Sequence, residues 1–193
     1  MHVIGAKDEI QSETTRLATS PPFSFCFLVA HMLHLSVETP EDTHEVEYLY
    51  DLAFAPGRQA LSSYRLRDGV PPVVELCLVA RGQEGTLAGA IRYWPVMIGT
   101  VEALLLGPVA VHPTRQGEGV GAQLISKSLK RAAELGWQRV ILVGDEPFYR
   151  RFGFIHTTGV NMPPPTNPNR VLGRALVAGA FSGVGGAVAK FRE

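Results

Sequence analysis

The sequence predicts a mixed α/β fold, in which a mixed sheet with an antiparallel run of strands is covered by helices. Its 193 residues suffice for one domain with a substantial core. Several runs of aliphatic and β-branched residues follow one another with short turns between them, which indicates antiparallel strands. Two segments repeat apolar residues at helical spacing, and the uninterrupted apolar run after the second is typical of a strand buried on both faces.

The first 32 residues differ from the rest of the chain. Residues 1–20 are polar without a clear period, and an apolar stretch, 23–30, follows two prolines. Mixed acidic and basic residues, with no small-residue cleavage site after them, argue against a signal peptide. A disordered arm, an extra packed element and a translation start at Met32 are the open alternatives. We expect the folded domain to occupy residues 33–193.

The next part of the chain predicts one strand and two helices. Residues 33–37 form the strand candidate, and Thr39 or Asp42 is suited to cap the helix that follows. Residues 45–54 carry apolar side chains at helical spacing, namely Val46, Leu49, Tyr50 and Ala53. A proline and a glycine end this helix, and residues 58–69 predict a second, shorter one.

Three strand candidates follow. Residues 73–80 and 87–98 flank a glycine-containing turn, which predicts a hairpin. The third run, 103–113, holds Gly107 and Pro108 in its middle. Proline removes a donor from the ladder and glycine loosens the backbone, so we expect a bulge or an edge irregularity there.

The last part of the chain alternates helix and strand. Residues 120–135 predict a helix whose apolar side chains share one face, namely Leu124, Ile125, Leu129, Ala132 and Leu135. The remaining predicted elements are a strand, a short helix and two strands, at residues 137–144, 146–152, 154–160 and 170–181. A glycine-rich tail ends the chain.

Composition and charge restrict the function. The formal net charge is +0, which gives no support to a nucleic-acid or membrane partner held by bulk charge. No apolar run reaches the ~20 residues that a membrane span needs. The two cysteines, Cys26 and Cys77, make no disulfide framework, which fits a reduced compartment. We therefore expect a cytoplasmic protein with neither kind of partner.

A glycine-rich stretch, RQGEGVG at residues 115–121, lies between the third strand candidate and a predicted helix. Such a turn lets backbone N–H groups approach a ligand closely, often a phosphate. A mononucleotide loop needs a lysine after its last glycine, and none follows Gly121. A dinucleotide fingerprint needs GxGxxG, whereas the spacing here is GxGxG. A tight turn without a ligand stays open as the alternative.

Around this loop the sequence resembles the GCN5-related N-acetyltransferases (GNATs). Residues 116–121 match the family's pattern of Gln or Arg, two residues, Gly, one residue, and Gly or Ala. The strand PVAVHP precedes the loop as in the family, and Tyr149 opens a Tyr-x-x-x-Gly-Phe element. The resemblance covers about residues 33–156, and the tail is similar to the YhbS-type branch. It implies a central mixed, mostly antiparallel sheet with helices on both faces and its fourth and fifth strands splayed.

The resemblance also implies acetyl-CoA as a co-substrate, with no metal. In the family, the pantetheine arm lies in the gap between the splayed strands, and the loop N–H groups face the pyrophosphate at the positive end of a helix. The implied cofactor-binding residues are Val109, Ala110, Val111, Arg115, Gln116, Gly117, Glu118, Gly119, Val120, Gly121, Ala122 and Phe148. Side chains at the three loop glycines would obstruct that approach.

The implied reaction is direct attack of a primary amine on the thioester through a tetrahedral intermediate. A backbone N–H at Ala110 or Val111 is expected to stabilise the oxyanion. The family pattern places Tyr149 to protonate the leaving thiolate as general acid, although a packed aromatic also explains this residue. Glu102 and Glu75 are candidate bases, each equally explained as a surface carboxylate.

Other polar residues have simple structural explanations beside a functional one. His112 borders the loop and could titrate near neutrality. His31 and His34 have the spacing of a metal-binding pair, but no third ligand is evident. Residues 92–94 are suited either to line an acceptor cleft or to pack across strands.

Together these features predict an N-acetyltransferase that transfers the acetyl group of acetyl-CoA to a small-molecule or protein amine, as a monomer or homodimer. The competing hypothesis is a non-catalytic module of the same fold that binds acyl-CoA. The intact loop fits both. Tyr149 and an acceptor cleft favour the enzyme, and an occluded cleft favours the sensor.

Overall fold

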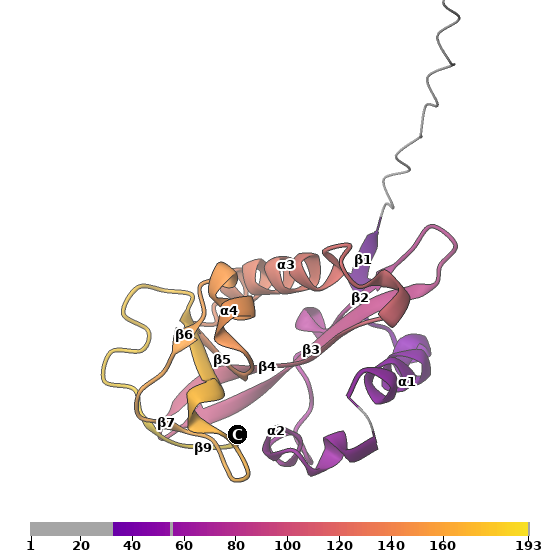
Figure 1. Ribbon diagram of the computed structural model, residues 1–193. Helices are drawn as coiled ribbons and strands as arrows, with labels where there is room; N and C mark the ends of the chain where they lie inside the picture. The colour runs from indigo at the N-terminus through magenta and orange to yellow at the C-terminus, as the bar shows by residue number, and fades with distance from the viewer. Residues whose placement is uncertain (1–32, 55, 193) are drawn as a thin grey trace, which may run out of the picture. The chain divides into compact units, whose positions relative to one another are not determined.

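The computed structural model describes residues 33–54 and 56–192, which belong to one compact unit (Figure 1). The expectations about residues 1–32 lie outside the described residues. The strands are β1 (His34–Val37), β2 (Leu78–Arg81), β3 (Leu87–Ile98), β4 (Val101–Val111), β5 (Arg139–Val143), β6 (Ile155–His156), β7 (Val160–Asn161), β8 (Val171–Ala175) and β9 (Gly186–Lys190). The α-helices are α1 (Thr43–Phe54), α2 (Ser62–Arg65), α3 (Val120–Glu134) and α4 (Glu146–Tyr149). None of the described helices is both long and apolar enough to cross a membrane.

The sheet is mixed and mostly antiparallel, as expected. Its strand order is β1-β2-β3-β4-β5-β8-β6, and within this order only β4 and β5 pair in parallel. The long strand β3 shares one edge between two partners, because β2 pairs with its first half and β9 with its end. The glycine-rich tail thus adds a strand to the sheet.

Strands β4 and β5 separate soon after they meet. They pair only at Leu104 with Val140 and at Leu105 with Ile141. Beyond this point β4 continues along β3 as far as Val111, while β5 continues along β8. The predicted splay is therefore present, and it opens the sheet at the second half of β4.

The predicted bulge lies where this opening begins. Ile91 and Tyr93 of β3, two positions apart, face Val109 and Leu106 of β4, three positions apart. The extra residue falls at Gly107 and Pro108. Gly107 has φ +121°, a backbone conformation that residues with a side chain rarely adopt.

Helices cover both faces of the sheet, as expected (Figure 1). The apolar face of α3 packs with Tyr93 and Leu104 in one core cluster. The apolar face of α1 packs with Ala90 and Ala110 in another. Neighbouring strand residues point to opposite faces, so the two clusters lie on the two sides of β3 and β4.

Several sequence predictions differ from the structure in detail. The strand predicted at residues 170–181 is shorter, because β8 ends at Ala175 and turns follow it. Residues 73–80, predicted as one strand, begin with a 3₁₀ turn (Val74–Leu76) before β2, since two prolines precede them. Residues 154–160 form no single strand, because Gly159 at φ +81° turns the chain between β6 and β7. Residues 58–69 hold a 3₁₀ helix (Pro56–Ala60) and then α2 in place of one helix.

Candidate active site

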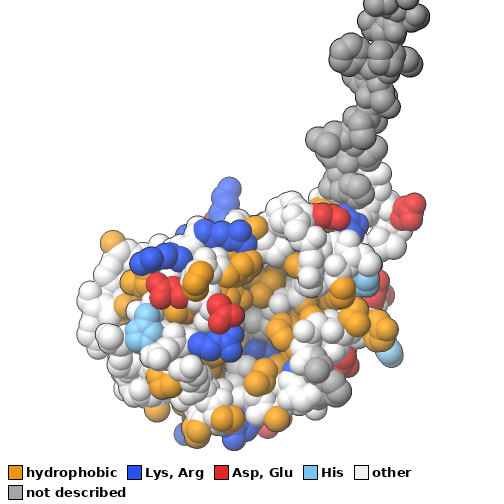
Figure 2. Space-filling model, viewed as in Figure 1, with side chains coloured by type: hydrophobic (Ala, Val, Ile, Leu, Met, Phe, Trp, Pro, Cys, Tyr) orange, Lys and Arg blue, Asp and Glu red, His pale blue; other side chains and the backbone are white. Residues whose placement is uncertain are grey.

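Two cavities meet where β4 leaves β5. The smaller, of about 400 Å³, lies in the gap between the two strands. It is lined by residues of β4, by the end of β5 and the two residues after it, and by the segment that follows, namely Leu105, Leu106, Gly107, Pro108, Val109, Val111, Val143, Gly144, Asp145, Phe148 and Tyr149, with Gly121 among others. The larger, of about 840 Å³, lies between α1, α2 and β3. Tyr64, Arg67 and Pro108 line both cavities. Figure 2 shows a hollow on this face, with hydrophobic and basic side chains at its walls.

The bulge decides which backbone groups of β4 face the smaller cavity. His112 donates its N–H to the carbonyl of Ala88 at 2.9 Å, and Ala110 lies opposite Ala90. Opposed residues in an antiparallel ladder alternate between hydrogen-bonded and non-bonded pairs, so Ala110 exchanges its hydrogen bonds with β3. Val109 and Val111 therefore direct their N–H and C=O groups toward the gap, and Ala110 does not.

The glycine loop leads into the N-terminus of α3. Gly119 is the N-cap residue at φ +78°, in the left-handed region, and no acidic side chain lies in the first helical turn. A Cβ on Gly117 or Gly119 would meet no protein atom within 4 Å, so these two glycines serve the backbone conformation. Gly121 is the loop residue that lines the smaller cavity, and a Cβ on it would lie 3.4 Å from Cγ2 of Val111.

The two charged side chains of the loop pair with each other. Arg115 pairs with Glu118 at 2.7 Å, and its Nη1 packs against the turn at Gly82. Neither side chain lines the cavities. The loop therefore offers backbone N–H groups at the positive end of α3, which is the usual arrangement of an anion site.

Tyr149 stands at the wall of the smaller cavity, held by aromatic neighbours. Its ring centroid lies 4.9 Å from that of Phe148 and 5.9 Å from that of Phe154. A side chain on Gly144 would overlap the ring, so this glycine lets Tyr149 lie against the end of β5. Burial, together with the negative charge of Asp145, raises the pKa of Tyr149 to about 12. The hydroxyl therefore stays protonated throughout the neutral range.

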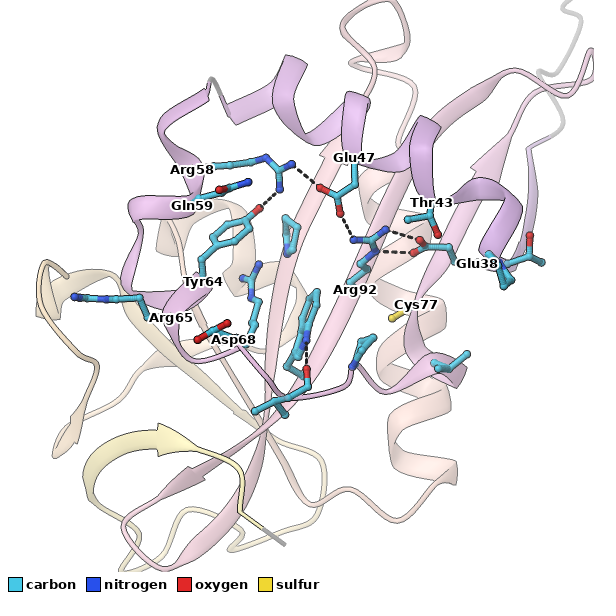
Figure 3. Close-up of a pocket in the computed structure, with 18 residues that line it drawn as sticks. Glu38, Thr43, Glu47, Arg58, Gln59, Tyr64, Arg65, Asp68, Cys77 and Arg92 are labelled. Atoms are coloured by element: carbon cyan, nitrogen blue, oxygen red, sulfur yellow. Dashed lines mark hydrogen bonds and ion pairs between the residues drawn. The ribbon is translucent and has the colours of Figure 1, made fainter.

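A chain of ion pairs forms one wall of the larger cavity (Figure 3). Arg92 on β3 binds Glu38 through two hydrogen bonds of 2.5 and 2.8 Å, and binds Glu47 of α1 at 2.5 Å. Arg58 contacts the other oxygen of Glu47 at 2.5 Å and the hydroxyl of Tyr64 at 2.7 Å. Burial would raise the pKa of Glu47, but the two arginines outweigh it and hold that pKa below its ordinary value. The pairs fix α1 and the segment after it over β3.

Arg67 differs from these arginines because it has no carboxylate partner among the described residues. Its side chain is 9% exposed, and its Nε and Nη1 atoms are buried without a hydrogen-bond partner. The guanidinium lies 4.3 Å from the ring centroid of Tyr64 and 4.7 Å from that of Trp94. Burial lowers the pKa of Arg67 to about 10, which still leaves it charged at neutral pH.

Several residues singled out in the sequence lie away from these cavities. Glu102 is exposed near the start of β4, and Glu75 is exposed in the 3₁₀ turn before β2; neither lines a cavity. His112 binds Thr114 at 2.7 Å and caps the turn after β4. His31 lies outside the described residues, and within them no three His, Cys, Asp or Glu side chains gather as a metal site requires.

Comparison with known proteins agrees with this geometry. Residues 74–156 match the model of the acetyltransferase (GNAT) domain. The chain is 32% identical over 123 residues to the uncharacterized N-acetyltransferase YhbS of Escherichia coli, over 62% of this chain and 72% of that protein. The chain belongs to the GNAT family. It is accordingly an acyltransferase of the N-acetyltransferase class.

Solved GNAT structures resemble the whole described unit. The crystal structure of YhbS from Escherichia coli in complex with CoA superimposes with a TM-score of 0.72 at 27% identity, covering 82% of this chain and 89% of that one. A GNAT acetyltransferase from Brucella melitensis in complex with acetyl-CoA gives a TM-score of 0.56 at 32% identity, covering 79% and 99%.

Sequence reasoning missed the residues that the 58–70 segment brings to the site. Tyr64 and Arg67 are three positions apart, and both reach the place where the cavities meet. The sequence shows three arginines within ten residues there, Arg58, Arg65 and Arg67, so charge alone singles out none of them. Nothing in the pattern reveals that one of these arginines is buried.

Proposed function

We propose that this GNAT protein transfers the acetyl group of acetyl-CoA to a primary amine, which enters through the larger cavity. The observation that carries the proposal is the junction of the two cavities at Pro108. One cavity follows the gap between β4 and β5, and the other opens beside α1 and α2. A donor in the first and an acceptor in the second would meet at the bulge of β4.

The residues present fit the CoA portion of the donor. Val109 and Val111 turn backbone donors and acceptors toward the gap, where an amide-containing arm can pair with them as an added strand would. The N-terminus of α3 with Gly119 at its cap suits a pyrophosphate. The apolar walls, Leu105, Leu106 and Phe148, suit the methylene groups of the arm.

A backbone N–H of β4 is expected to activate the thioester of the donor. Bound acetyl-CoA supplies an acyl thioester, and attack by the amine converts its carbonyl into a tetrahedral oxyanion. Pro108 has no N–H, so the N–H of Val109 is the first donor after the bulge that faces the gap. We assign oxyanion stabilisation to Val109 in place of Ala110, whose N–H is used by β3.

Tyr149 is proposed to donate its proton to the departing sulfur. A pKa of about 12 keeps the hydroxyl protonated, but it also makes full transfer to a thiolate of pKa ~8.5 unfavourable by itself. The proton that Tyr149 gives up is replaced by one from the protonated nitrogen of the tetrahedral intermediate. The C–S bond breaks, sulfur gains the tyrosine proton, and the amide nitrogen loses its own.

Direct attack is preferred to an acyl-enzyme route. Cys77 lines the larger cavity, but burial raises the pKa of its thiol to about 11, so it is no ready nucleophile. Glu47, half-exposed in the same cavity, is ionised and suited to attract an ammonium group. Its lowered pKa makes it a weak base, so we propose that water removes the ammonium proton. The open larger cavity favours this enzyme over a non-catalytic acyl-CoA sensor.

The test begins with calorimetric titration of acetyl-CoA, CoA, ATP and NAD into the protein. We expect micromolar binding of acetyl-CoA and CoA, and no binding of ATP or NAD. Gly119→Leu should lose this binding, because leucine does not readily adopt the left-handed conformation of the helix cap. Gly57→Ala, at a site with open space around it, is the matched control. A panel of amines is then assayed for release of free thiol. A folded protein that binds no acetyl-CoA would refute the proposal.

A further inference from the structure

We infer that Arg67 is the binding site for a carboxylate of the acceptor, so that the substrate is a small amino acid-like amine. This inference rests on the proposed function. Its starting point is a buried cation with no anion beside it, at the junction of the donor and acceptor cavities.

The surroundings of Arg67 hold its charge without neutralising it. The ring centroids of Tyr64 and Trp94 lie within 4.7 Å of the guanidinium carbon, where the rings attract the cation. Two of its nitrogens lack any hydrogen-bond partner. A buried charge in this state is unfavourable until an anion joins it.

Space for such an anion exists next to the third nitrogen. Nη2 of Arg67 lies 3.8 Å from the point that a Cβ on Gly107 would occupy, and Gly107 has no side chain. Gly107 stands two residues before Val109, which is roughly 6–7 Å along an extended strand. A carboxylate at Nη2 and an amine attacking beside Val109 are therefore separated by only a few bonds, as in an α- or β-amino acid.

The ion-pair chain of the same cavity offers a place for the other end of such a molecule. Of its three carboxylates, Glu38 and Glu47 line the cavity and pair with Arg92 and Arg58, whereas Asp51 pairs with Arg58 outside the cavity lining. The side chain of Glu47 is 42% exposed and can accept an ammonium group, whereas Arg67 attracts an anion. A single unpaired guanidinium matches the one charge of a carboxylate better than a phosphate, which carries up to about two charges.

Binding can be observed without turnover, because Trp94 contacts Arg67. In a Trp137→Phe background Trp94 is the one remaining tryptophan. Its emission is followed while a panel of amino acids is added, each paired with its carboxamide, together with aminomethylphosphonate. We expect a saturable change with amino acids and about 10- to 100-fold weaker binding of the amides, as loss of a charged hydrogen bond predicts.

The matched variants are Arg67→Gln and Arg65→Gln. Arg65 lines the same cavity and carries the same charge, but its side chain is exposed. Arg67→Gln should abolish the preference for amino acids over amides, and Arg65→Gln should keep it. Equal binding of acids and amides, no saturable change for any acid, an unchanged Arg67→Gln protein, or tighter binding of the phosphonate each overturns the inference.

Turnover separates this inference from the proposed function. With acetyl-CoA present, Arg67→Gln should raise KM for amino acids about 10- to 100-fold more than it raises KM for their amides. A fall in kcat for acids and amides alike would assign Arg67 to the oxyanion and overturn the carboxylate site. Carboxylate binding without any thiol release would remove the proposed function but leave the anion site. Equal turnover of amines with and without a carboxylate would support the proposed function and overturn the carboxylate site.

Discussion

The ring of Tyr149 occupies the space that a side chain on Gly144 would need. A Cβ built on Gly144 lies 2.9 Å from Cδ2 of this ring and still closer to its Cε2. Gly144→Ala should therefore push the ring away from the end of β5. We expect about 1–3 kcal/mol lower stability in denaturant unfolding and a lower kcat, since overpacking forces side chains to shift.

A second substitution tests this cause. In Gly144→Ala with Tyr149→Leu, the smaller side chain should recover part of the stability but not kcat, because Leu142 Cδ1 also lies 2.9 Å from that Cβ. Gly57→Ala serves as the control, because open space surrounds that position. An unchanged kcat in Gly144→Ala would show that the position of the Tyr149 ring does not matter.

Tyr149→Phe removes the hydroxyl and keeps the ring packing. We expect kcat to fall by about 100-fold or more, with acetyl-CoA affinity in calorimetry nearly unchanged. Because the pKa of Tyr149 is about 12, the wild-type kcat should show no decline from this group up to pH ~10.5. Equal kcat values for the two proteins would remove the acid role; Tyr48→Phe, on an exposed side chain, is the control.

The fold of the second half could be predicted because its signals are local. The period of α3, the apolar run of β5 and the spacing of the glycine loop all lie within short windows. The orientation of the backbone N–H of Ala110 could not be predicted, because it depends on the bulge at Gly107. One extra residue there changes which backbone N–H and C=O groups of β4 face β3 and which face the gap. The sequence indicates that a bulge is present, but it does not fix the register that follows the bulge. Arg67 was missed for another reason: only the tertiary structure brings its buried guanidinium to Pro108.

Proline substitutions in β4 distinguish the two candidate oxyanion donors. Val109→Pro removes an N–H that faces the gap and breaks no bond to β3, so kcat should fall by about 10²- to 10³-fold with a small loss of stability. Ala110→Pro removes an N–H that β3 uses, and it should mainly destabilise the protein in thermal unfolding. The opposite pattern would return the oxyanion role to Ala110.

Arg67→Met should stabilise the protein in the absence of substrate. The methionine can pack between Tyr64 and Trp94, while the two unpaired buried nitrogens disappear. Replacing an uncompensated buried charge by an apolar group of similar length is expected to raise the free energy of unfolding by about 1 kcal/mol, net of the lost ring contacts. Denaturant unfolding measures this directly. A clear loss of stability would mean that Arg67 is held for the fold.

Acid should weaken the attachment of α1 to the sheet through Glu47. Its pKa in the folded protein lies below the ordinary value of 4.5, because Arg58 and Arg92 stabilise the carboxylate against the effect of burial. A lowered pKa gives stability that is complete above pH 4.5 and is lost as the pH falls through the folded value. Unfolding free energies between pH 6 and pH 3 should therefore drop less steeply in Glu47→Gln than in the wild type, while the variant is the less stable protein at pH 6. Parallel curves for the two proteins would show that Glu47 takes no part in the acid response, and the coupling between α1 and β3 would then rest on the apolar contacts of Val46, Leu49 and Tyr50 alone.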